Sequence, residues 1–159
     1  MTGLIEGIFI GLTKREPMRP VREASITETG IVGDRYAAGM GSFTKVNEAG
    51  DAGRHVTLIE AEAIATARDQ FGVDWSGGLH RRNVVTRGMQ LNGLINRRLQ
   101  IGEVILRGER HCHPCRHLEK LTTLEAMRSL QMRGGLRMGV LRGGIIRVGD
   151  AIQLLEGNR

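Results

Sequence analysis

Glycine is the residue that most constrains what this chain can fold into. The 159-residue sequence holds 23 glycines and three prolines, and the glycines are spread along the chain rather than clustered. Glycine permits tight turns and close backbone approach. The spacing therefore favours many short strands joined by turns over a helical bundle.

The apolar pattern divides the chain into short elements. Alternation over residues 4–12 predicts a first strand, and 14–20 is expected to be a loop because two prolines and several charges interrupt any pattern. Further strands are predicted at residues 21–29, 55–59, 83–86, 104–107, 138–141, 144–148 and 151–155. Helical spacing predicts helices at 60–71, ended by Gly72, and at 118–132, and 39–53 is expected to be a long loop.

These elements predict one domain over residues 1–159, with a mainly β fold of mostly antiparallel strands and two or more helices. Ile101-Gly102-Glu103 and Val148-Gly149-Asp150 are each interpreted as a tight turn leading into a strand. No apolar run is long enough to cross a membrane, and the N-terminus lacks the basic start of a signal peptide. We therefore expect a cytoplasmic protein whose two cysteines are reduced.

Positive charge is concentrated in one part of the sequence. The net charge is +6, but residues 81–147 contain thirteen arginines and one lysine against four glutamates, a local balance of +10. This asymmetry indicates an anionic small-molecule partner or a solvated basic face. A nucleic-acid binder is disfavoured because the chain has five aromatic residues and no stacking motif.

The segment His111-Cys112-His113-Pro114-Cys115-Arg116-His117 holds both cysteines and three of the five histidines. A structural zinc site would need two further ligands, for which His55 and His80 are available. A thioredoxin-like pair is a second reading, since the segment precedes a predicted helix. The favoured reading is one reactive thiolate at Cys115 beside cationic neighbours. Two ordinary thiols in a turn remain the alternative without function.

Two other segments offer groups for an anion. Arg81 and Arg82 at the start of a strand suit a phosphate or carboxylate, and the Asn83 amide suits a heterocycle. Taken alone, such an arginine pair is more often a solvated patch. The stretch Gly30–Arg35 is interpreted as a glycine turn with an exposed ion pair, whose backbone amides could bind an anion.

Taken in order, these motifs resemble the MOSC family, the domain also found at the C-terminus of molybdenum cofactor sulfurases. The matching segments are Gly30-Ile-Val-Gly-Asp-Arg35, Arg54-His-Val-Thr-Leu-Ile-Glu60, Arg81-Arg-Asn-Val-Val-Thr-Arg-Gly88, Leu99-Gln-Ile-Gly-Glu-Val104, Cys112-His-Pro-Cys115 with Leu118, Gly135-Leu136 through Val140-Leu141, and Gly143-Gly-Ile145 with Val148-Gly-Asp150. Each motif is weak alone, but together they span nearly the whole chain.

The resemblance implies a β-barrel-like fold and an essential cysteine that ligates molybdenum or carries sulfur. Cys115 aligns best with that cysteine, and it would be the metal ligand. Arg81 and Asn83 match the family's pterin-phosphate strand. The candidate cofactor-binding residues are Arg35, Arg54, Arg81, Arg82, Asn83 and His113.

Two functions follow from the resemblance and stay open. In the first, a molybdenum–pterin cofactor, not covalently attached through its organic part, supports reduction of N-hydroxylated substrates. The sequence shows no cysteine-rich iron–sulfur ligand set, so an electron-donor protein would be a partner. In the second, Cys115 carries a persulfide delivered by a cysteine desulfurase, an enzyme class that uses pyridoxal phosphate, and Cys112 assists as a shuttle.

Overall fold

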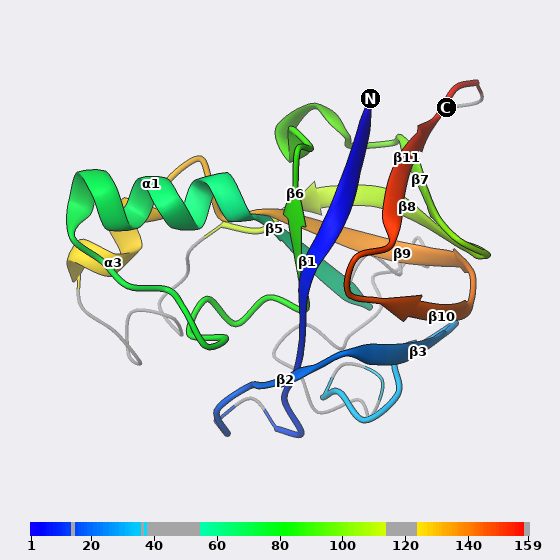
Figure 1. Cartoon of the computed structure of the whole chain (residues 1–159), viewed down its shortest axis with the longest axis horizontal. Coiled ribbons are helices and arrows are strands. Elements are labelled where there is room, and N and C mark those ends of the chain that lie inside the picture. The colour runs from blue at the N-terminus through cyan, green and yellow to red at the C-terminus, as the bar shows by residue number, and fades with distance from the viewer. Residues whose placement is uncertain (14, 36, 38–54, 114–123, 158–159) are drawn as a thin grey trace, which may run out of the picture.

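The computed structural model describes residues 1–13, 15–35, 37, 55–113 and 124–157. Its strands are β1 (Thr2–Ile10), β2 (Arg19–Val21), β3 (Glu23–Thr27), β4 (Gly30–Ile31), β5 (Val56–Glu60), β6 (Val84–Arg87), β7 (Arg98–Ile101), β8 (Val104–His111), β9 (Leu136–Arg142), β10 (Gly144–Arg147) and β11 (Ala151–Leu155). Its helices are α1 (Ala61–Phe71), the 3-10 turn η1 (Leu91–Gly93) and α3 (Leu124–Ser129). The predicted mainly β fold with two α-helices is confirmed (Figure 1).

Seven strands close into a barrel. Their order is β11-β7-β8-β9-β5-β6-β1, and pairing between β1 and β11 closes the ring. β2 adds to β1 outside the ring, and β3, β4 and β10 form a separate three-stranded sheet. Closure leaves the seven ring strands without a free edge, which protects the backbone from pairing with other chains.

One parallel pair interrupts the antiparallel order among the described strands. β5 and β6 run in the same direction and are joined by α1. A parallel pair needs such a crossover, whereas antiparallel neighbours can be joined by tight turns. The predicted turn at Gly102 is one of these, because Ile101 pairs with Val104 and Gly102 has φ +58°. The other predicted turn holds Gly149 at φ +95°, before β11.

Two hydrophobic cores form around this plan. The larger fills the barrel with aliphatic side chains such as Ile5, Leu99 and Leu106, each 0% exposed. The smaller lies between the barrel wall and the two α-helices, around Trp75. The Trp75 Nε1 donates to Ser129 Oγ at 2.9 Å, which links the loop after α1 to α3. α1 and α3 therefore cover one side of the barrel as a single layer (Figure 1).

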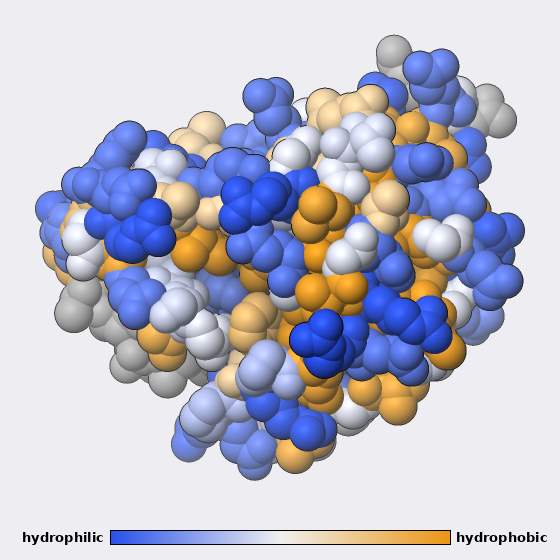
Figure 2. Space-filling view, in the orientation of Figure 1, coloured by the Kyte–Doolittle hydropathy of each residue, from blue (hydrophilic) through white to orange (hydrophobic). Residues whose placement is uncertain are grey.

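The surface reflects this arrangement. The face over α1 is largely hydrophilic, and the hydrophobic residues that reach this view gather over the neighbouring strands (Figure 2). Leu4 on β1 and Ile145 on β10 are 40% and 44% exposed. No helix within the described ranges combines the length and apolarity that a membrane crossing would need.

Sequence patterns located most elements and misplaced some boundaries. The helix predicted at 60–71 is α1, and Gly72 ends it with φ +66° while donating to the carbonyls of Ala67 and Arg68. The strand predicted at 21–29 is wrong as one element, because Val21 ends β2 and Glu23 begins β3. Pro20 belongs to β2 rather than to a loop, and an outer strand tolerates proline because its N–H is not needed. The strand β7 was missed.

The second predicted helix is partly described. α3 covers Leu124–Ser129, a turn follows from Leu130, and the start of the predicted helix lies outside the described residues. The predicted loop at 39–53 also lies outside them.

Candidate functional site

The segment Arg81–Asn83 lies directly before β6 and is buried. Arg81, Arg82 and Asn83 are 9%, 6% and 0% exposed. The reading of the two arginines as a solvated patch is therefore wrong. Burial of a guanidinium requires hydrogen-bond acceptors nearby. Carbonyl groups of the loop after β1, the loops before β6 and β9 and the residue after β8 supply them.

Asn83 joins the starts of β5 and β6 to the end of β1. Its Oδ1 accepts from the backbone N–H and from the hydroxyl of Thr57, both at 3.1 Å. Its Nδ2 donates to the carbonyl of Phe9 at 3.2 Å, and its backbone N–H donates to Thr57 Oγ1 at 3.0 Å. Thr57 lies on β5 and Phe9 on β1. Both the oxygen and the nitrogen of the side-chain amide therefore hydrogen-bond to protein atoms.

Asp34 and Arg35 form a buried ion pair. The distance between Arg35 Nη1 and Asp34 Oδ1 is 3.2 Å, and the two side chains are 4% and 0% exposed. The expected exposed pair is corrected by this finding. The physical reason is that Asp34 accepts from the backbone N–H of Gly11 at 2.9 Å, while Arg35 Nη2 donates to the carbonyl of Arg81 at 3.1 Å. The pair therefore fastens the Gly30–Arg35 turn to two other loops.

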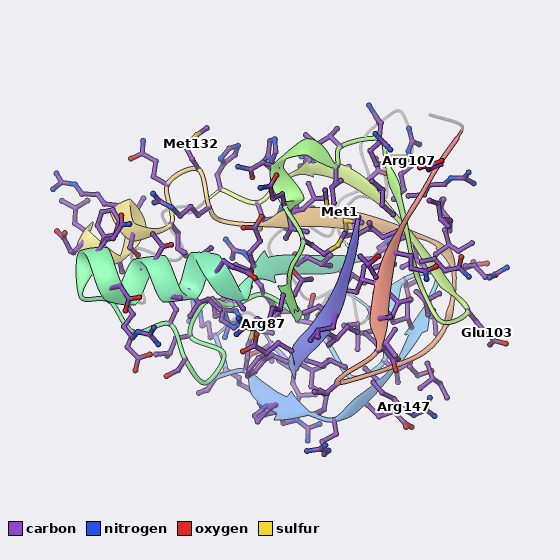
Figure 3. All side chains as sticks on the ribbon, turned by 45° about the horizontal axis from the view of Figure 1, so that its top comes forward. Met1, Arg87, Glu103, Arg107, Met132 and Arg147 are labelled. Atoms are coloured by element: carbon purple, nitrogen blue, oxygen red, sulfur yellow. The ribbon has the colours of Figure 1, made fainter. Side chains whose placement is uncertain are left out.

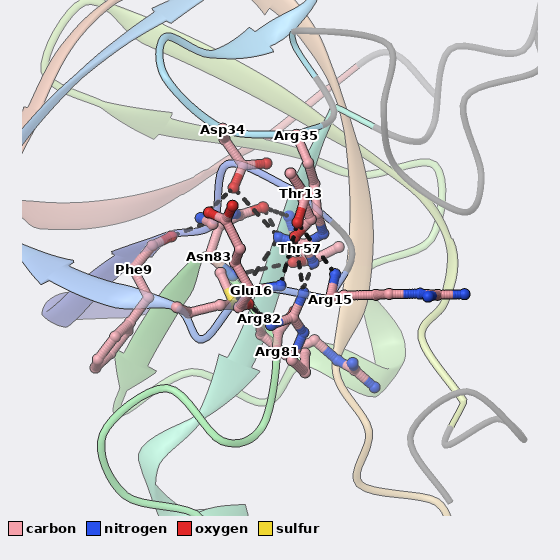
Figure 4. A network of polar contacts seen from close by, with 12 residues as sticks. Phe9, Thr13, Arg15, Glu16, Asp34, Arg35, Thr57, Arg81, Arg82 and Asn83 are labelled. Carbon is pink, nitrogen blue, oxygen red and sulfur yellow. Dashed lines mark hydrogen bonds and ion pairs between the residues drawn. The ribbon is translucent and has the colours of Figure 1, made fainter. Parts of the chain in front are cut away.

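Arg81 completes this polar network (Figure 4). Its backbone is left-handed, with φ +62°, a conformation uncommon for a residue other than glycine. Its guanidinium donates to the carbonyls of Thr13, at 3.2 Å, and Glu16. Arg81 thus holds the loop that follows β1, at the same end of the barrel as the Asp34–Arg35 pair.

Arg82 points toward the cysteine segment. Its Nε donates to the carbonyl of Gly134 at 2.8 Å, and Nη1 donates to the carbonyl of His80 at 3.1 Å. Its Nη2 makes a longer contact of 3.5 Å with the carbonyl of Cys112. One buried side chain therefore links the loop before β6, the loop before β9 and the residue after β8.

His80 supports the same loop as a neutral imidazole. Its Nδ1 accepts from the backbone N–H of Arg82 at 2.9 Å, and its ring stands edge-on to Phe9 with centroids 5.1 Å apart. Burial, with a smaller effect of the nearby Arg82 charge, lowers the pKa of His80 to about 3. A neutral ring is required for this acceptor role, because a protonated Nδ1 would be a donor.

Cys112 is the described member of the cysteine pair. It is 1% exposed and forms no disulfide with a described residue. Its backbone N–H donates to the carbonyl of Gly135 at 2.8 Å, so the end of β8 is fixed against the start of β9. His111 is half-buried and His113 is exposed. The predicted reactive cysteine, Cys115, and the predicted cofactor-binding residue Arg54 lie outside the described residues.

Three neighbouring hollows lie beside the end of β8. The first measures about 110 Å³ and is lined by Asn92, His111, Cys112, His113, Met132, Gly134 and Gly135. The second measures about 160 Å³ and lies between the start of α1 and the Met132 turn, with Glu60, Glu62, Thr66 and Arg133 in its wall. The third, a groove of about 380 Å³ along α3, is lined by His113, Leu124, Met127, Arg128, Gln131 and Met132.

Met132 belongs to all three hollows. It is 73% exposed and has φ +63°. The Asn92 Nδ2 donates to its carbonyl at 3.1 Å, which fixes the turn after α3. Figure 3 shows the Met132 side chain pointing outward from that turn, on the side of the molecule opposite Arg107 and Glu103.

The second hollow carries the carboxylates of this region. Burial raises the pKa of Glu60, the hydrogen bond from the Leu91 N–H at 2.7 Å opposes this shift, and the Glu62 charge adds to it. Glu62 accepts from the backbone N–H of Gly88 at 2.9 Å. These carboxylates disfavour an anion in the second hollow.

The predicted site residues thus separate into two groups. His113 lines the first hollow and the groove, whereas Arg35, Arg81, Arg82 and Asn83 bind protein atoms in the network of Figure 4. Met132, Asn92 and Arg128 were missed. They carry no sequence motif, and folding alone brings them to this place. That any of the predicted residues binds a cofactor stays a prediction.

The zinc reading finds no support in the described part of the chain. His80 Nδ1 accepts a backbone hydrogen bond, and His55 Nδ1 has no hydrogen-bond partner within that part. Within the ranges that the structure describes, no group of three His, Cys, Asp or Glu residues is placed to hold a metal ion. Any set that includes Cys115 lies beyond those ranges.

Known proteins with a similar architecture were found among solved structures. The YuaD protein of Bacillus subtilis is 22% identical, with a TM-score of 0.78 over 96% of this chain and 94% of that one. YiiM from Geobacillus stearothermophilus is 15% identical, with a TM-score of 0.73 over 97% and 75%. YiiM from Escherichia coli is 16% identical, with a TM-score of 0.68 over 99% and 71%.

These structural similarities show the shared fold. A comparison with curated protein sequences found no match. The family model described as "MOSC domain" matches residues 45–153, more than half of the chain. The chain therefore belongs to the MOSC domain family, whose members are associated with the molybdenum cofactor.

Proposed function

We propose that this chain binds a molybdenum–pterin cofactor through the thiolate of Cys115 and supports reduction of N-hydroxylated substrates. The observation that carries the proposal is the convergence of hollows at the end of β8, where His113 lines both the first hollow and the α3 groove. Cys115 follows His113 by two residues in the sequence, and we propose that its sulfur faces these hollows.

The α3 groove fits an anionic cofactor in size and charge. The α3 groove, at about 380 Å³, falls within the range of roughly 300–1,000 Å³ that is typical of small-molecule sites. Arg128 contributes a guanidinium to the groove, and guanidinium groups recognise phosphate well. Among the described residues, no carboxylate lines the groove or the first hollow. A pterin phosphate would therefore meet attraction there and repulsion beside Glu60 and Glu62.

In this proposal the buried polar network of Figure 4 does not bind the cofactor and instead fixes the loops at this end of the barrel. Direct use of Asn83 would break its hydrogen bonds to Thr57 and Phe9 in a fully buried place, at a cost of about 1–3 kcal/mol for each group left unpaired. We propose that Arg82 fixes the exit of β8 through the carbonyls of Cys112 and Gly134, and that Arg81 and Arg35 fix the loops at the same end of the barrel. Binding by Arg54 stays a prediction.

The proposed reaction needs electrons and protons from outside the metal. Bound molybdenum supplies two-electron removal of an oxygen atom. In balance, an N-hydroxylated amine takes up two electrons and two protons, its N–O bond breaks, and an amine and water are released. A separate electron-donor protein supplies the electrons.

Metal analysis of matched cysteine variants tests the proposal. The protein is purified from a host that makes the cofactor, and molybdenum and intact mass are measured together. About one molybdenum per chain, lost in Cys115→Ser and kept in Cys112→Ala, supports binding through Cys115. Activity with an N-hydroxylated base and a supplied reductase system should follow the metal. A chain without molybdenum that gains one sulfur atom on Cys115 would instead establish the sulfur carrier fed by a cysteine desulfurase.

A further inference from the structure

The first hollow is lined by side chains whose nitrogen and sulfur atoms can bind a metal ion. Two imidazoles, those of His111 and His113, and the thioether of Met132 line the same space of about 110 Å³. Cys112 also lines it, but this residue is 1% exposed and offers it little surface. The hollow is therefore edged by nitrogen and sulfur donors that the proposed molybdenum site does not use as ligands.

The spacing of the two rings fits one shared ion. An imidazole nitrogen binds a metal at about 2.0–2.1 Å, which puts the ring centroid roughly 3.2 Å from the ion. Two rings on one ion at a wide angle are then about 6 Å apart, centroid to centroid. The observed centroids of His111 and His113 are 6.0 Å apart, with a tilt of 57° between the rings.

The third donor comes from a fixed turn. The Met132 backbone is held by Asn92, while its unbranched side chain turns about three bonds and can bring the sulfur to either side of the turn. In Figure 3 this side chain extends outward from the turn, and the residue lines the first hollow.

The donor set selects the class of metal. Hard cations such as Mg²⁺ and Ca²⁺ require carboxylate or carbonyl oxygens, and the described lining of this hollow has no carboxylate. Thioethers and imidazoles without negative charge suit a soft monovalent ion. We propose that His111, His113 and Met132 form a binding site for a soft monovalent cation, Cu(I) or Ag(I), distinct from the thiolate of Cys115.

The test removes the competing thiols first. In the Cys112→Ala/Cys115→Ala protein, Cu(I) is titrated under reducing, oxygen-free conditions against a chromophoric Cu(I) chelator. One Cu(I) per chain is expected. His111→Gln or His113→Gln should weaken binding by about 100-fold, and Met132→Leu by about tenfold. The matched controls His55→Gln and Met127→Leu, which change the same residue types outside this hollow, should leave the affinity unchanged.

A second measurement uses the wild-type protein and does not depend on the double variant folding. Methionine methyl groups are labelled, and the Met132 signal is assigned by its loss in Met132→Leu. After the thiols have been saturated with Ag(I), the next equivalent should shift the Met132 methyl signal and the imidazole nitrogens of His111 and His113. Unshifted signals, or an affinity that is the same in the histidine and methionine variants as in their controls, would overturn the proposal. Both readouts are independent of molybdenum, so failure here leaves the Cys115 proposal standing.

Discussion

Arg82 and Gly134 are joined by a hydrogen bond of 2.8 Å, from the Arg82 Nε to the Gly134 carbonyl oxygen. The two residues are 52 positions apart in sequence. The same guanidinium also reaches the carbonyls of His80 and Cys112. The start of β6 is thereby fixed to both chain segments that enclose the first hollow.

Loss of this link should destabilise the fold. Arg82→Met removes the donors and leaves buried carbonyls unpaired, so the free energy of unfolding should fall by about 3 kcal/mol. Arg82→Lys should recover part of the loss. Urea denaturation measures both. The matched control is Arg107→Met, which removes an exposed bond to Asn96 and should change stability by about 0.5 kcal/mol or less. Equal losses at the two arginines would remove the assigned role of Arg82.

Asn83 and Thr57 should be energetically coupled. Each of Asn83→Leu and Thr57→Val removes shared hydrogen bonds in a buried place and should cost about 2 kcal/mol. Because both changes remove the same contacts, the double variant should lose less than their sum, with a coupling energy of about 1–2 kcal/mol. A double-mutant cycle from urea denaturation measures this energy. Strict additivity would show that the two side chains act separately.

Stability should fall in mild acid because of His80. The pKa of His80 is about 3 in the fold and 6.5 in the unfolded chain. Between these two pH values the histidine is protonated in the unfolded chain and unprotonated in the folded protein. The free energy of unfolding is therefore highest above pH 6.5 and decreases as the pH falls toward 3. At pH 5 the loss should be on the order of 2 kcal/mol.

The pH effect has its own control. His80→Asn keeps an acceptor near the Arg82 N–H and removes the titrating ring, so the unfolding free energy should depend less on pH between 4 and 7. His113→Asn changes an exposed histidine and should leave the wild-type dependence in place. Urea denaturation at several pH values gives both slopes. An unchanged slope in His80→Asn would assign the effect to another group.

Gly135 should resist substitution for two reasons. Its φ is +98°, and a Cβ there would lie 1.9 Å from the carbonyl oxygen of Leu58. Gly135→Ala should therefore cost more than about 3 kcal/mol and loosen the contact between β9 and β5. Gly102→Ala is the matched control, with φ +58° and no atom near the added carbon, and should cost about 1 kcal/mol. Thermal unfolding of the two variants separates the clash from the backbone strain.

Local patterns were reliable where one segment decides its own structure. The helix ending at Gly72 and the turns at Gly102 and Gly149 depend on a few neighbouring residues, and each was predicted. The division of residues 19–27 into two strands was missed, because it depends on which distant strand each part pairs with: Val21 faces Ile8 on β1, and Glu23 faces Arg147 on β10.

The sequence by itself determined a mainly β domain with two helices, a concentrated basic region and membership of a family, because alternation, glycine spacing and motif order are local or linear properties. Tertiary structure alone decided that Arg82 and Asn83 face protein atoms and that Met132 lies beside His113. The Asn83 side-chain amide finds its donors 26 positions away in the chain and its acceptor 74 positions away. A buried polar group must satisfy its hydrogen bonds wherever the fold places partners, and no spacing in the sequence records where that is.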